Sequence, residues 1–133
     1  MFKPITTTLA TLAIALAGAT AMSSASAATP VDGKNFSGGL WMQGEKAPQH
    51  DEFVFKDGTF RSTACDKYGF AAAPYRVSQE GDAMRVEAET MSPTQGRIVW
   101  KGTIRAGQFE GVSSWQPMHG KAVEAWFRAQ AAN

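Results

Sequence analysis

Short turn-forming sequences recur about every eight to twelve residues between Gly39 and Gly120, and this spacing limits the fold more than any other feature of the chain. Glycine and proline at such intervals separate short strands that pair antiparallel with their neighbours along the chain. The sequence therefore predicts an all-β fold, an antiparallel up-and-down meander of about eight strands that closes into a small barrel. The turn sequences are Gly44, Asp57-Gly58, Ala73-Pro74, Gly81-Asp82, Pro93, Gly96, Ala106-Gly107 and Pro117 to Gly120.

Two segments show the strand pattern most clearly. Residues 53–62 place an Asp57-Gly58 turn between two runs that carry aromatic residues. Asp-Gly supplies the positive φ angles that a tight hairpin turn requires. Residues 84–89 alternate apolar and charged side chains, which indicates a strand with one face buried. Met84, Val86 and Ala88 are therefore expected to face the core.

The same alternation continues through the next two predicted strands. It places Ile98, Trp100 and Ile104 on one face, with Gly102 between them. In the following strand, one face carries small residues between two large aromatic residues. Small residues in this position either make room for a neighbouring ring or leave a cavity, and both alternatives stay open here. The residues of that face are Phe109, Gly111, Ser113 and Trp115.

Residues 1–27 have the features of a secretory signal peptide. Lys3 is followed by an apolar run from Leu9 to Ala19 and by the small-residue sequence Ala25-Ser26-Ala27. The apolar run is about half as long as the ~20 residues that a membrane-spanning helix needs, so no membrane span is expected. Cleavage near Ala27 predicts a soluble protein that is located in the periplasm or secreted. Residues 28–37 are then expected to be a flexible lead-in, and residues 38–133 a single β-barrel domain.

Charge and cysteine content narrow the class of partner. Lys3 is the only charged residue in positions 1–27, so the mature chain carries 12 basic and 12 acidic residues. A balanced charge disfavours binding to nucleic acid or to an anionic membrane surface. Cys65 is the only cysteine, which excludes a disulfide within the chain. The barrel must therefore be stabilised by packing, to which the aromatic residues contribute most.

The last segment, Gly120 to Ala132, fits two patterns. Val123, Trp126, Phe127 and Gln130 have near-helical spacing, whereas Val123, Ala125 and Phe127 also alternate as in a strand. We expect a strand, because a meander of seven strands needs an eighth to close its exposed edge.

Gly39-Leu40-Trp41 at the start of the first strand, together with Arg128 near the end of the last, resembles the pattern of the lipocalin-like, or calycin, superfamily. The resemblance implies that Trp41 closes one end of the barrel and that Arg128 packs over its ring as a cation partner. A tryptophan in that role predicts that Trp41→Ala lowers the free energy of unfolding by about 3 to 5 kcal/mol.

A second, local resemblance is to the META or HslJ type of bacterial envelope domain. Those domains have a strand, a glycine turn and a second strand that ends in Gly-Cys-Asn, and here Phe55 to Cys65 follows the same order. Ala64 stands where that pattern has glycine, and Asp66 where it has asparagine.

Cys65 is the residue whose role the sequence leaves most open. An unpaired thiol in an oxidising compartment is oxidised or forms an intermolecular disulfide unless it is buried. Burial is the commoner explanation, and the alternatives are a reactive thiol or a Cys65-linked dimer rather than a monomer. His50 and His119 lie in polar turns, at a spacing that fits no metal-ligand pattern. We therefore expect neither a metal nor a cofactor.

No catalytic motif is present. The sequence contains neither Gly-x-Ser-x-Gly nor His-Glu-x-x-His, so we expect a protein that is not an enzyme. The remaining candidate site is aromatic. If several rings line an open barrel mouth, the protein binds a small hydrophobic or aromatic ligand there. The alternative is a protein-binding module, such as an inhibitor of an envelope or secreted hydrolase. The candidate ligand-binding residues are Tyr68, Phe70, Tyr75, Trp100 and Trp115.

Overall fold

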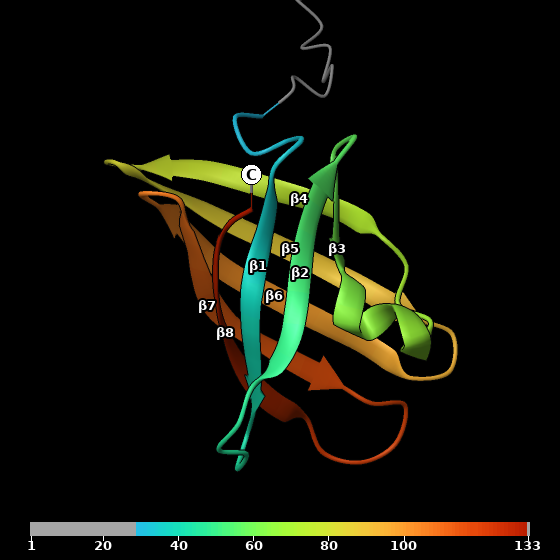
Figure 1. Cartoon of the computed structure of the whole chain (residues 1–133). Coiled ribbons are helices and arrows are strands. Elements are labelled where there is room, and N and C mark those ends of the chain that lie inside the picture. Colours follow the sequence, from blue (N-terminus) through green and yellow to red (C-terminus); the bar gives the residue numbers. More distant parts are fainter. Residues whose placement is uncertain (1–28, 133) are drawn as a thin grey trace, which may run out of the picture.

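A computed structural model describes residues 29–132, and the predicted signal peptide at residues 1–27, with its cleavage site near Ala27, lies outside the described residues. The described part confirms the predicted fold class, because eight antiparallel strands follow one another in meander order and close into a barrel (Figure 1). The elements are β1 (Asn35–Met42), β2 (Gln49–Lys56), β3 (Thr59–Ser62), the 3₁₀ helix η1 (Thr63–Tyr68), β4 (Ala73–Glu80), β5 (Ala83–Ser92), β6 (Gly96–Arg105), β7 (Gln108–Gln116) and β8 (Val123–Ala131).

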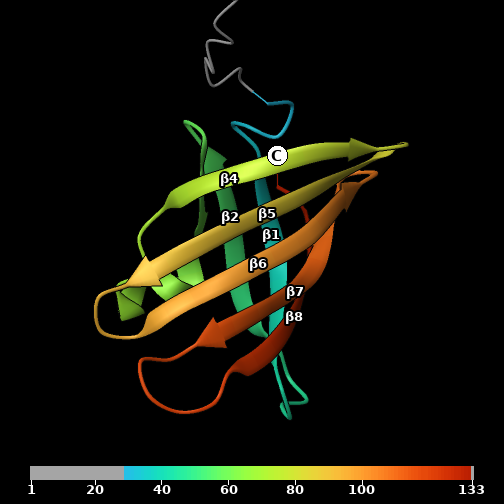
Figure 2. The ribbon, with the colours of Figure 1, turned by 180° about the vertical axis from the view of Figure 1, so that it is seen from behind.

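Strand β8 closes the barrel by pairing with both β7 and β1. The last segment is therefore a strand, as expected, and its buried residues Ala125, Phe127 and Ala129 alternate with exposed ones. Figures 1 and 2 show the closure from opposite sides, with β1 beside β8 in both views. The predicted hairpin between β2 and β3 is also present: Asp57 and Gly58 have φ angles of +52° and +75°, as a type I′ turn requires.

Aromatic rings fill the middle of the barrel. Most of their contacts are edge-on or tilted, which are the arrangements that aromatic quadrupoles favour. Gly102 makes room for two of these rings, since a Cβ there would lie 2.4 Å from the ring of Phe109 and 3.0 Å from that of Phe127. Gly111, one of the small residues between Phe109 and Trp115, lies instead against the backbone of β6, since a Cβ there would lie 2.1 Å from the carbonyl oxygen of Lys101. The fully buried rings are Phe36, Phe53, Phe55, Phe60, Trp100, Phe109 and Phe127.

Residues 29–37, the described part of the segment expected to be a flexible lead-in, pack against the barrel and lead into β1. Val31 is fully buried, and β1 begins at Asn35, opposite Val54 of β2. Gly38 and Gly39 lie within this strand. A Cβ at Gly38 would lie 2.1 Å from the carbonyl oxygen of Arg128, so glycine is required there by the close approach of β8.

The predicted roles of Trp41 and Arg128 also need correction. Leu40 holds the buried position, so the alternation of β1 directs Trp41 to the outer face. There its ring stacks on Trp126 of β8, with ring centroids 3.9 Å apart. Arg128 forms an ion pair with Glu110 at 3.4 Å instead of packing over Trp41. Both residues lie on the outer surface of the barrel, and neither closes its end.

Within residues 29–132, no helix is both long and apolar enough to cross a membrane.

Candidate functional site

A cavity of about 210 Å³ lies at the end of the barrel where η1 is located. Its wall is formed by β1, β2, β6, β7 and β8, by η1 and the segment after it, and by the turn between β5 and β6. Most of the lining atoms are apolar, and no charged side chain is among the described residues that line it. The lining residues are Leu40, Met42, Gln49, Ala64, Cys65, Tyr68, Phe70, Gln95, Ile98, Trp100, Trp115, Val123 and Ala125.

The structure brings four of the five candidate ligand-binding residues together. Tyr68, Phe70, Trp100 and Trp115 all line the cavity. The inward faces of β6 and β7 supply the two tryptophans, as the alternation predicted, and η1 with its following segment supplies the other two rings.

Tyr75 is the exception among the five. Its hydroxyl group contacts Thr29 Oγ1 at 2.6 Å and donates to Asp32 Oδ1 at 3.0 Å. Its ring packs edge-on against Phe55. Tyr75 therefore does not line this cavity, and its hydroxyl group instead holds the N-terminal segment against β4.

Both tryptophan N–H groups in the cavity wall already have acceptors. Trp100 Nε1 donates to Thr90 Oγ1 at 2.9 Å, and Trp115 Nε1 donates to the carbonyl oxygen of Gln95 at 2.7 Å. The indole rings therefore offer apolar surface to the cavity but no free donor. Sequence reasoning missed Gln95, because a glutamine in a polar turn carries no sign that its side chain borders a cavity.

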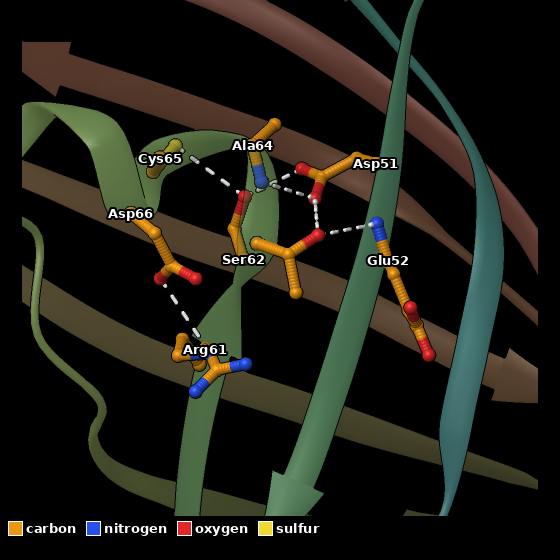
Figure 3. A network of polar contacts seen from close by, with 8 residues as sticks. Asp51, Glu52, Arg61, Ser62, Ala64, Cys65 and Asp66 are labelled. Atoms are coloured by element: carbon orange, nitrogen blue, oxygen red, sulfur yellow. Dashed lines mark hydrogen bonds and ion pairs between the residues drawn. The ribbon is translucent and has the colours of Figure 1, made fainter.

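A buried carboxylate holds η1 against the barrel (Figure 3). Asp51 of β2 is fully buried, and its Oδ2 accepts a hydrogen bond from Ser62 Oγ at 2.5 Å. Its Oδ1 accepts one from the backbone N–H of Ala64 at 3.1 Å and a longer one from Thr63 Oγ1 at 3.5 Å. These contacts fix the first residues of η1, the helix that carries Ala64, Cys65 and Tyr68 into the cavity wall.

The role of Asp51 was not predicted from the sequence. The sequence holds one indication of it: alternation along the strand places Asp51 on the same face of β2 as Phe53 and Phe55. Burial raises the pKa of Asp51, and the hydrogen bonds from Ser62 and from the Ala64 backbone oppose that shift.

Cys65 is buried, with 8% of its surface exposed, which is the first of the explanations considered for this unpaired cysteine. Its Sγ lies 3.3 Å from Ser62 Oγ and faces the cavity. Burial raises the pKa of the thiol to about 11. At neutral pH Cys65 is therefore a protonated thiol, and its polarisable sulfur forms part of the cavity wall.

We expect Cys65 to react slowly with alkylating reagents in the folded protein. A thiol pKa of about 11, against an ordinary value of 9.0, lowers the thiolate fraction at pH 8 by roughly 100-fold. Iodoacetamide labelling followed by mass spectrometry should show a rate at least that much below the rate in urea. Equal rates in the two conditions would contradict the buried position of the thiol.

The two histidines, His50 and His119, are both exposed. Within residues 29–132, no three or more His, Cys, Asp or Glu side chains are grouped closely enough to hold a metal ion.

The fold and the site define the described part of the chain as an eight-stranded antiparallel β-barrel with a small apolar cavity near one end. Comparisons with protein-family models, with curated proteins and with solved structures found no match.

Proposed function

We propose that the protein is a non-catalytic binding protein that holds one small, neutral hydrophobic or aromatic molecule in the cavity beside η1. The observation that carries this proposal is an apolar cavity bordered by four aromatic side chains at one end of the barrel. Up-and-down barrels of eight strands, such as the lipocalins, use their interior in this way. That likeness concerns the fold, so the case for binding rests on the cavity itself.

The volume of the cavity limits the size of the ligand. An apolar cavity of about 150 Å³ is large enough to take up benzene, so about 210 Å³ suits a single ring with a short substituent or a small fused ring system. Larger, drug-sized ligands occupy pockets of about 300 Å³ or more.

The chemistry of the wall limits the charge of the ligand. A charged group moved into this cavity would lose its hydration without finding an oppositely charged partner. Gln49, Gln95 and Tyr68 supply the few polar groups, so a neutral ligand with one amide, carbonyl or hydroxyl group matches the wall. The signal peptide predicted from residues 1–27 supports the further proposal that the protein acts in the periplasm or outside the cell.

Benzamide and benzoate form a matched pair that tests this proposal, since they have nearly the same shape and differ in charge. We expect benzamide to bind and to change the fluorescence of Trp100 and Trp115, and benzoate to bind at least about tenfold more weakly. Equal affinity for the two compounds, or binding of neither benzamide nor naphthalene, would contradict the proposal and favour the protein-binding alternative.

A cavity-filling variant locates the binding site. Ala125 lines the cavity and is 7% exposed, so Ala125→Leu should occupy ligand space and weaken benzamide binding. Ala72→Leu makes the same chemical change at an exposed position that is not part of the wall, and it should bind benzamide as the parent does. Binding that survives Ala125→Leu unchanged would place the ligand elsewhere.

A further inference from the structure

Strand β4 has one edge that is largely unpaired. It pairs with β5 from Tyr75 to Glu80, but with β3 only at Thr59–Pro74 and Phe60–Ala73. The hairpin of β2 and β3 turns at Asp57-Gly58, opposite Tyr75, so residues 76–80 of β4 run past its tip. Figure 2 shows β4 as the upper rim of the barrel, with β5 below it. Among residues 29–132, no strand pairs with this edge beyond Tyr75.

The phase of the ladder identifies the backbone groups that face this edge. Glu80 and Ala83 flank the two-residue turn of the β4–β5 hairpin and form a hydrogen-bonded pair, as in other hairpins of this length. Every second residue of β4 therefore bonds to β5, and the N–H and C=O groups of Val77 and Gln79 point the other way. The N–H of Tyr75 shows the same phase, because it donates to the carbonyl oxygen of Gly58 on the β3 side.

The outward side chains along this edge carry opposite charges. Arg76, Ser78 and Glu80 are all exposed, and the two charged residues lie at equal distances on either side of Ser78. A charged edge strand usually repels other strands. Here the opposite signs make the edge complementary to itself when it is turned by 180°.

We propose that a second copy of this chain binds at this edge, with β4 antiparallel to β4 of the partner and a twofold axis at Ser78. The N–H and C=O groups of Val77 then pair with those of the partner's Gln79, and the same bonds form in reverse. Arg76 lies opposite the partner's Glu80, and Glu80 lies opposite the partner's Arg76. The sheet continues from one barrel into the other.

Neighbouring charges on β5 support this register. Arg76 lies 2.9 Å from Glu87 in the single chain, so the row across the interface reads Glu87, Arg76 and then the partner's Glu80, with alternating signs. At the twofold axis, Ser78 lies opposite Ser78 of the partner in a pair that is not hydrogen-bonded. The two backbones approach closely at such a pair, so a small side chain fits there. A shift of the partner by two residues would place Arg76 opposite the partner's Ser78 or, in the other direction, opposite the turn residue Asp82 of the partner, and either shift loses both Arg76–Glu80 pairs.

The contact is narrow, so the dimer is expected to be weak and to depend on protein concentration. Sedimentation of the purified protein in the presence of reductant, from micromolar to millimolar concentration, should show a reversible monomer–dimer equilibrium. The reductant removes any dimer formed through Cys65. A parent protein that stays monomeric at millimolar concentration would overturn the proposal.

Charge reversals test the register. R76E and E80R each place like charges opposite one another at both ends of the interface, so each should weaken dimerisation by more than about tenfold. The double variant R76E/E80R restores opposite charges across the interface, so it should dimerise more strongly than either single variant, although it loses the ion pairs with Glu87 and Arg85 within each chain. An equimolar mixture of R76E and E80R should form a heterodimer for the same reason. Single variants that dimerise like the parent, or a double variant and a mixture that both stay monomeric, would show that another surface or partner is used.

Discussion

The Phe53→Ala protein is expected to lose about 3 to 5 kcal/mol of its free energy of unfolding, which is a large part of the stability of a domain of this size. Phe53 is fully buried, and its ring lies within 6.1 Å, centroid to centroid, of four other rings. Its removal leaves a cavity that the surrounding rings close only in part. Urea unfolding followed by circular dichroism measures the loss. The four neighbours are Phe60, Trp100, Phe109 and Phe127.

Trp41→Ala is the matched control for this prediction. Its ring stacks on Trp126 at the outer face, and Trp126 is itself 46% exposed. Truncation there leaves no enclosed cavity, so we expect a loss of about 1 to 2 kcal/mol. This is less than the loss that a tryptophan closing the barrel end would produce. If Trp41→Ala destabilises the protein as much as Phe53→Ala does, the outward placement of Trp41 is wrong.

The strands and their inward faces could be predicted because each depends on local information. The period of two and the positive-φ turn at Asp57-Gly58 both lie within a few residues of the structure that they determine. Alternation also placed Trp100 and Trp115 on the same inner surface. Alternation predicts which face of the sheet a side chain occupies, but it does not predict the end of the barrel at which the side chain lies. That position depends on the tilt and stagger of the strands. Tyr75 shows this limit: its ring packs against Phe55, away from the cavity.

The errors at β1 have a different cause. Leu40 and Trp41 are adjacent, so only one of them can face inward, and the resemblance to a Gly-x-Trp motif selected the wrong one. The role of Gly38, which is to let β8 approach, was not predicted, because this contact joins residues about ninety positions apart. Asp51 was missed because the residues that it binds become its neighbours only after β3 has folded back on β2.

Asp51→Ala is expected to lower the free energy of unfolding by about 2 to 4 kcal/mol. The change leaves the N–H of Ala64 without its acceptor and the hydroxyl of Ser62 with only the weak acceptor Cys65 Sγ, and an unsatisfied buried group costs about 1 to 3 kcal/mol. It also releases the start of η1, so iodoacetamide should label Cys65 faster than in the parent. Asp51→Asn keeps an acceptor oxygen and the side-chain shape, and it should be clearly less destabilising in both measurements.

The parent and the Asp51→Asn variant together predict a dependence of stability on pH. Burial raises the pKa of Asp51 in the folded state above the ordinary value of 3.8, so the folded protein binds this proton more tightly than the unfolded chain does. The stabilisation by this proton is fully present below pH 3.8 and is lost as the pH rises through the folded-state pKa. The Asp51→Asn variant carries a neutral side chain at every pH and therefore lacks this dependence. The stability of the parent relative to Asp51→Asn should fall from acid toward neutral pH, as measured by urea unfolding at a series of pH values. A difference that stays constant with pH, or that grows toward neutral pH, would show that the hydrogen bonds to the carboxylate outweigh its burial.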